Sequence, residues 1–112
     1  MVLTAIRRNR RRHAADLDRI RVVGVRVRGG YEPDTIRAEA GVPLRLVFRR
    51  EESSPCSEQV VFPAFGKSAT LPQGERVTVE LLPTEPGEYE FTCAMGMLYG
   101  RLIVVAPGEA AR

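Results

Sequence analysis

The chain has 112 residues, of which 44% are hydrophobic, and it contains no run approaching the roughly 20 apolar positions that cross a bilayer, so one soluble domain with its own core is expected. The net charge of +3 is concentrated at the N-terminus, where the chain carries Arg7, Arg8, Arg10, Arg11 and Arg12. The remainder holds 12 basic and 14 acidic residues, which argues against a nucleic-acid-binding domain, because such domains carry positive charge on the folded surface.

Residues 1–19 show no clean hydrophobic period, and we expect them to form a flexible basic arm. The arginines are followed by polar residues rather than by the apolar stretch of a secretory signal, so export is not expected. The expected location is the reducing cytoplasm, where two cysteines serve as metal ligands or redox groups more often than as a structural disulfide. Contact of the arm with an anionic membrane stays open.

From Ile20 onward, apolar residues recur at every second position, which is the pattern of half-buried β-strands. Glycine and proline clusters separate these segments at the spacing expected of a β-sandwich. The sequence therefore predicts an all-β sandwich of about seven strands over residues 20–106, with a C-terminal tail at 107–112. The expected strands are residues 20–28, 36–40, 44–49, 60–62, 77–81, 88–93 and 101–105, and the stretch 65–68 is ambiguous.

Two of the expected strands carry cysteines near their ends. The polar residues 50–55 are expected to form a loop that brings Cys56 to the start of the strand at 60–62. In the strand at 88–93, Tyr89 and Phe91 alternate with polar residues, so Cys93 is expected to end a row that faces the core.

Further sulfur donors follow Cys93. Met95 and Met97 lie two and four residues beyond it, in a loop loosened by Gly96, and Cys56 can join them if both strands end at the same pole. Thiolate and thioether ligands suit Cu(I), whereas Zn(II) normally takes four Cys or His ligands, which this domain lacks. We therefore predict a Cu(I) site formed by Cys56, Cys93, Met95 and Met97. A second Cu(I) bridged by the same thiolates is a hypothesis.

Simpler interpretations of these residues stay open. Cys56 and Cys93 can be ordinary buried thiols or a disulfide, and the methionines can fill gaps in the core. Methionines that alternate with small residues on a glycine-containing loop are poorly placed for core filling. Because the convergence that suits a metal also brings thiols within disulfide distance, oxidation of the metal-free protein is compatible with the copper prediction.

Other polar and aromatic residues near these cysteines have structural explanations. Tyr31, Tyr89 and Phe91 are expected to pack in the core, with a buried tyrosine hydroxyl bonded to the backbone near a loop corner. Glu51, Glu52 and Glu58 are expected to be a solvated charge run, of which Glu58 is the one to test as an oxygen donor.

The motifs resemble a known family. The elements Gly30-Tyr31-Glu32-Pro33, Pro55-Cys56-Ser57-Glu58 and Thr92-Cys93-Ala94-Met95-Gly96-Met97 look like the cupredoxin-like domains of bacterial Cu(I) chaperones and of some copper-exporting P-type ATPases. The resemblance covers roughly residues 20–106. It implies a Greek-key β-sandwich that binds copper at one pole, through the residues matching Cys56, Cys93, Met95 and Met97, and passes it to an export ATPase.

The function predicted on this basis is a cytoplasmic Cu(I) chaperone or buffer for copper tolerance, with no small-molecule substrate. An electron-transfer cupredoxin is an alternative, but its copper needs two histidines, and this chain has only His13, outside the sandwich. Another alternative is an interaction module with structural cysteines, whose basic arm contacts nucleic acid or membrane. An enzyme is not expected, because neither a Cys/His or Ser/His/Asp set nor a Gly-rich phosphate loop is visible in the domain.

Overall fold

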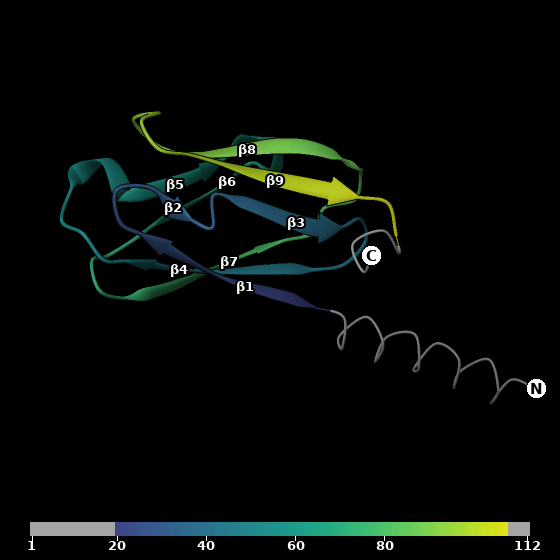
Figure 1. Ribbon diagram of the computed structural model, residues 1–112, viewed down its shortest axis with the longest axis horizontal. Helices are drawn as coiled ribbons and strands as arrows, with labels where there is room; N and C mark the ends of the chain where they lie inside the picture. Colours follow the sequence, from purple (N-terminus) through teal and green to yellow (C-terminus); the bar gives the residue numbers. More distant parts are fainter. Residues whose placement is uncertain (1–19, 108–112) are drawn as a thin grey trace, which may run out of the picture.

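The computed structural model describes residues 20–107, which form a β-sandwich of nine strands in two facing sheets (Figure 1). The four-stranded sheet has the order β2-β1-β4-β7 and consists of β1 (Arg21–Val27), β2 (Tyr31–Glu32), β4 (Leu44–Arg50) and β7 (Arg76–Leu81). The five-stranded sheet has the order β3-β9-β8-β5-β6 and consists of β3 (Thr35–Glu39), β5 (Gln59–Phe62), β6 (Lys67–Thr70), β8 (Gly87–Cys93) and β9 (Tyr99–Val105). Two 3-10 helices, η1 (Pro55–Ser57) and η2 (Pro63–Phe65), flank β5.

The pairing of strands follows from how the chain crosses between the sheets. β1 and β4 are parallel because the chain visits the other sheet, as β3, between them. β3 and β9 are also parallel, and the remaining pairs are antiparallel. This arrangement confirms the predicted all-β sandwich, and its regular strands begin at Arg21 and end at Val105.

The prediction of about seven strands was too low by two. β2 has only two residues, which is too short to show an alternating pattern, and it pairs with the end of β1. β6 begins within the ambiguous stretch 65–68 and continues to Thr70. Its residues are mostly polar and exposed because it is an edge strand paired only with β5. The basic arm and residues 108–112 lie outside the described residues.

The core between the sheets is centred on aromatic rings. Phe48 from β4 and Phe62 from β5 are fully buried beside Phe91 from β8. The centroid of the Phe91 ring lies 5.2 Å from that of Phe62 and 5.0 Å from that of Tyr31. These ring contacts fix the position of β8 at Phe91, two residues before Cys93.

One end of the sandwich gathers the predicted sulfur residues. β8 ends and β9 begins there, joined by residues 94–98, and the loop of residues 51–58 follows the end of β4 at the same end, on the left of Figure 1. We call these two loops together the sulfur pole. In residues 20–107, no helix is long and apolar enough to cross a membrane.

Candidate metal centre

Cys93 is the last residue of β8 and is 1% exposed. Its sulfur is the acceptor of two backbone hydrogen bonds, from the N–H of Met97 at 3.1 Å and from the N–H of Leu98 at 3.3 Å. The loop can turn back in this way because Gly96 has φ near +70°, in the left-handed region that glycine adopts most easily. The chain after Cys93 therefore wraps around the sulfur and points N–H dipoles at it.

These dipoles change the acidity of the thiol. Burial by itself raises the pKa of Cys93, but backbone N–H groups of Leu98, Met97, Met95 and Gly96 favour the thiolate and bring the pKa below its usual range. A thiolate is the form that binds a soft metal ion. The surroundings of Cys93 are thus arranged for a negatively charged sulfur.

Cys56 lies in η1, immediately before β5, rather than at the start of a strand as predicted. Pro55 starts this short helix, and the Ser54 side chain accepts a hydrogen bond from the Cys56 N–H at 3.3 Å. The register of β5 on β8 pairs Val60 with Cys93, which places η1 at the same end of the sheet as the end of β8. The partly buried Cys56 thiol lies 3.7 Å from the Met97 thioether, measured from Sγ to Sδ.

Met97 connects the two cysteines. Its backbone N–H contacts the sulfur of Cys93 and its thioether contacts the sulfur of Cys56. Met97 is 64% exposed and Met95, in the same loop, is 63% exposed, so both thioethers are accessible from solvent. The structure therefore brings Cys56, Cys93 and Met97 together and places Met95 at the rim. Their role as copper ligands stays a prediction.

Both cysteines are free thiols in this structure. Within residues 20–107 no group of three or more His, Cys, Asp or Glu side chains could hold a metal ion. The further soft side-chain donors beside the two thiols at the sulfur pole are the thioethers of Met95 and Met97. Glu58, the carboxylate singled out from the sequence, is exposed beside η1.

Arg50 was expected in a polar loop and was not predicted to belong to the site. Arg50 is the last residue of β4 and is only 6% exposed. Its guanidinium donates to Ser57 Oγ at 2.9 Å, to the Leu71 carbonyl at 3.0 Å and to the Ser54 carbonyl at 2.9 Å. A signal was present, because Leu44, Leu46 and Phe48 alternate towards the core and position 50 continues their face.

Tyr31 also differs from expectation. Its ring packs against Phe48 and Phe91, but its buried hydroxyl has no hydrogen-bond partner in the structure. Burial, with a smaller contribution from the nearby Cys93 thiolate, strongly raises the pKa of this hydroxyl. By contrast, the hydroxyl of Tyr89 bonds to the Glu85 carbonyl at 2.7 Å, as predicted for a tyrosine near a loop corner.

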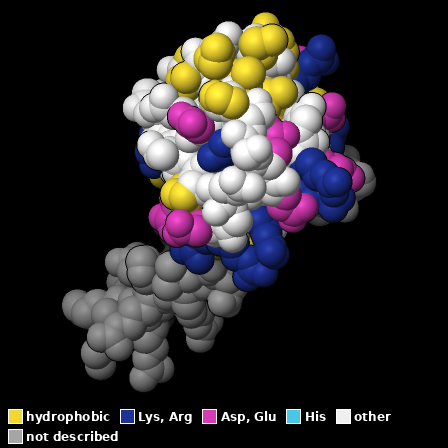
Figure 2. Space-filling view, turned by 90° about the vertical axis from the view of Figure 1, so that its left-hand side faces the viewer, with side chains coloured by type: hydrophobic (Ala, Val, Ile, Leu, Met, Phe, Trp, Pro, Cys, Tyr) yellow, Lys and Arg dark blue, Asp and Glu magenta, His cyan; other side chains and the backbone are white. Residues whose placement is uncertain are grey.

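The surface around the sulfur pole is uneven. In the end-on view of Figure 2, hydrophobic side chains gather at the top, and charged side chains of both signs are scattered among uncharged groups over the rest. Met95 and Met97 belong to the exposed hydrophobic residues, as does Tyr99 at the start of β9.

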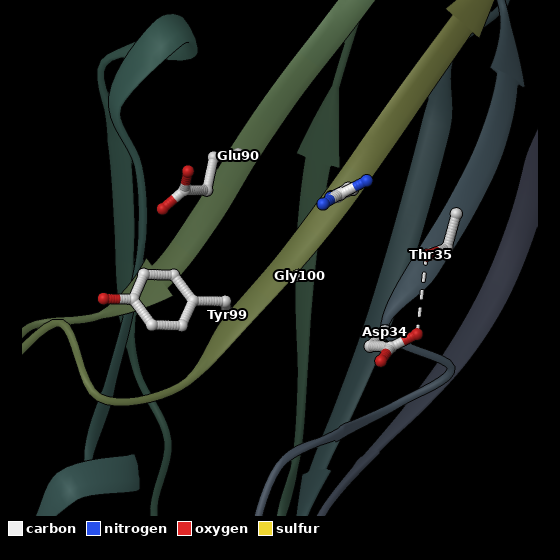
Figure 3. A pocket seen from close by; sticks show the side chains of 6 residues that line it. Asp34, Thr35, Glu90, Tyr99 and Gly100 are labelled. Atoms are coloured by element: carbon white, nitrogen blue, oxygen red, sulfur yellow. Dashed lines mark hydrogen bonds between the residues drawn. The ribbon is translucent and has the colours of Figure 1, made fainter.

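A shallow depression begins next to Tyr99, on the outer face of the five-stranded sheet. Asp34 and Thr35 lie on one side of it, with Glu90 and Tyr99 on the other (Figure 3). Arg101, which also lines it, pairs with Glu88 at 3.4 Å. No cysteine or methionine lines the depression, and none of its lining residues belongs to the sulfur pole.

Comparison with known proteins places this chain in a family. Its residues 1–104 match the family model described as a cupredoxin-like domain. No curated protein matches the chain.

Solved structures are similar over most of the sandwich. One, described as the NMR solution structure of a copper binding protein in the apo form, is 45% identical over 78% of this chain and 89% of that one, with a TM-score of 0.74. Another is the metal binding domain of the Streptococcus pneumoniae Cu(I) exporting P-type ATPase CopA with Cu(I), at 29% identity over 78% and 87% of the two chains and a TM-score of 0.76. Auracyanin B, at 16% identity over 76% and 88% of the chains and a TM-score of 0.62, shares the fold. The chain therefore belongs to the cupredoxin-like domain family.

Proposed function

We propose that this protein binds Cu(I) at the sulfur pole and serves as a copper chaperone or buffer. The observation that carries the proposal is the bridging position of Met97, whose thioether lies 3.7 Å from the Cys56 sulfur while its N–H bonds to the Cys93 sulfur at 3.1 Å. The Met97 thioether thus contacts one thiol while the backbone of the same residue contacts the other. Soft sulfur donors of this kind select Cu(I).

The surroundings of Cys93 support the same proposal. The backbone N–H groups that lower its pKa favour the thiolate, which is the form of cysteine that binds a metal ion. The two structures most similar to this chain among those compared above are a copper binding protein and a domain solved with Cu(I), which is consistent with copper as the cargo.

The exposed thioethers give the site a route for release. Cys56, Cys93 and Met97 would hold one ion, and Met95 at the rim would bind a second ion or receive the first on its way out. An incoming thiolate from a partner would form a new Cu–S bond as the weaker Met97–Cu bond breaks. The Cys56 and Cys93 thiolates would then dissociate from the ion as further partner ligands bind it. The copper stays Cu(I) throughout, so no oxidant or reductant is required.

The partner we propose is a copper-exporting P-type ATPase, because the metal binding domain of such an ATPase shares this fold. A cytoplasmic location and a binding role, rather than an enzymatic one, follow from this proposal. An electron-transfer role would require imidazole ligands, and the single histidine, His13, lies outside the described residues.

An anaerobic competition titration against a Cu(I) chelator of known affinity tests the proposal. Wild-type protein is expected to compete with the chelator, and Cys56→Ser and Cys93→Ser are each expected to lose tight binding. Glu58→Gln is a matched control beside Cys56 and is expected to bind as wild type. Tight binding that survives both serine substitutions contradicts the proposal, and so does an intense visible band on adding Cu(II), which would indicate a blue copper site.

A further inference from the structure

The buried guanidinium of Arg50 hydrogen-bonds to several chain segments next to the sulfur pole. Its three hydrogen bonds reach Ser54 and Ser57 in the loop of residues 51–58 and Leu71 in the segment between β6 and β7. The backbone of Arg50 also takes part, since its carbonyl accepts a hydrogen bond from the Gly74 N–H at 2.7 Å. One side chain therefore joins the end of β4 to two loops.

These contacts enclose Cys56 on both sides. Ser54 is two residues before Cys56 and Ser57 is the residue after it, and both accept hydrogen bonds from Arg50. Ser57 Oγ in turn donates to the Ser54 carbonyl at 3.1 Å, and Ser54 Oγ accepts from the Cys56 N–H. The position of η1, and with it the direction of the Cys56 thiol, is thus tied to a core strand through Arg50.

Stability alone does not explain a cation in this place. Among the described residues, none of the ion pairs involves Arg50, and its guanidinium donates to neutral oxygens. The pKa of the nearby Glu52 carboxyl is lowered mainly by hydrogen bonds from the Ser57 side chain and the Gly29 N–H, with a smaller contribution from the Arg50 charge. A hydrophobic residue at a buried position often stabilises a fold as well as a buried ion does. The planar fork of arginine, however, can hold several acceptors in fixed directions, which an apolar side chain cannot do.

We propose that Arg50 is a positioning residue for copper binding, which holds the Cys56 thiol against the Met97 thioether in the metal-free protein so that these ligands are in place before the ion arrives. This inference rests on the proposed function, because it assigns to Arg50 a task within that same site. It is not a ligand, and it acts through Ser54 and Ser57.

The test compares Arg50→Met with Arg49→Met, which removes the neighbouring, exposed arginine of the same strand. Arg50→Met is expected to lower the Cu(I) affinity at least about tenfold, and to show one fewer sulfur neighbour in the X-ray absorption spectrum of the copper-loaded protein. Arg50→Lys is expected to recover only part of the affinity, because one ammonium cannot reach all three acceptors in the same geometry. Arg49→Met is expected to match wild type. A folded Arg50→Met variant with wild-type affinity and sulfur count overturns the inference.

Ser57→Ala and the alkylation rate of Cys56 in the metal-free protein test the same inference independently of Arg50→Met folding. Ser57→Ala removes one acceptor of Arg50 and leaves the buried arginine in place, so it is expected to fold and to weaken Cu(I) binding several-fold. In metal-free protein, alkylation of Cys56 in native buffer is expected to be several-fold faster in Ser57→Ala and Arg50→Met than in Arg49→Met, and equal rates contradict the inference. If wild type itself fails to bind Cu(I), the proposed function is refuted, while the alkylation rates still report whether Arg50 holds the Cys56 loop.

Discussion

Gly100 faces the ring of Phe91 across the β8–β9 pair, and its replacement by alanine tests how tightly the core beneath Cys93 is packed. A Cβ atom at position 100 would lie 2.1 Å from Cζ of Phe91 and within 2.7 Å of two further ring atoms. The ring cannot retreat freely, because the rings of Tyr31 and Phe62 lie at centroid distances of 5.0 and 5.2 Å. Added volume in a well-packed core costs about 1–3 kcal/mol. For a domain of this size that corresponds to a fall in Tm of about 4–24 °C.

Thermal unfolding followed by circular dichroism gives the stability, and Cu(I) competition gives the effect on the site. Because Phe91 lies two residues before Cys93 on the same face of β8, its displacement is expected to weaken Cu(I) binding as well. Gly24→Ala is the matched control, since a Cβ at Gly24 in β1 meets nothing within 4 Å. A Gly100→Ala variant as stable as Gly24→Ala would refute the packing described here.

Three further predictions concern the sulfur pole. Met97→Leu is expected to weaken Cu(I) binding by about tenfold, or about 1.4 kcal/mol. Met95→Leu is expected to weaken it less, because only the Met97 thioether contacts Cys56. Equal losses of affinity in competition titrations would contradict this. The pKa of Cys93 is lower in the folded than in the unfolded protein, so the Cys93 thiolate stabilises the fold increasingly as pH rises towards about 8.5. Urea unfolding of Cys56→Ser, compared with Cys56→Ser/Cys93→Ser, is therefore expected to show a free-energy difference that grows with pH. A difference that does not depend on pH would disprove this. Tyr31→Phe removes an unpartnered buried hydroxyl and is expected to leave the metal-free protein as stable or up to about 1 kcal/mol more stable in urea unfolding, whereas a clear loss would show that the hydroxyl has a partner.

Local pattern was sufficient to predict much of the sandwich and half of the site. The alternation that ends in Cys93 correctly predicted a core-facing thiol, and Gly96 correctly marked a loop. That this loop turns back over the Cys93 sulfur was not predicted. The side of the molecule on which Cys56 lies depends instead on the register of β5 against β8, which pairs residues 33 positions apart in sequence, Val60 and Cys93. No local pattern specifies such a pairing. The sequence could therefore predict that Cys56 joins the other sulfur donors only if both strands end at the same pole.

Arg50 and Tyr31 show where residue type misleads. The period of two continues through position 50, but a charged residue after Phe48 is usually read as the start of a loop, because buried charges are rare. Its burial depends on three oxygens from two loops, which are brought to it only by the tertiary fold. Tyr31 and Tyr89 were expected to behave alike, yet only Tyr89 has a carbonyl within reach, four residues before it along the chain. The acceptors available to Tyr31 depend on the packing around its hydroxyl, which sequence spacing does not reveal.

In the proposed site, Cys56, Cys93 and Met97 bind copper through sulfur alone. X-ray absorption at the copper edge, recorded on the anaerobically loaded protein at one copper per chain, measures this directly. We expect Cu(I) with only sulfur neighbours in wild type, and one fewer sulfur neighbour in Met97→Leu. Nitrogen or oxygen neighbours in wild type, or a sulfur count that Met97→Leu leaves unchanged, would contradict it.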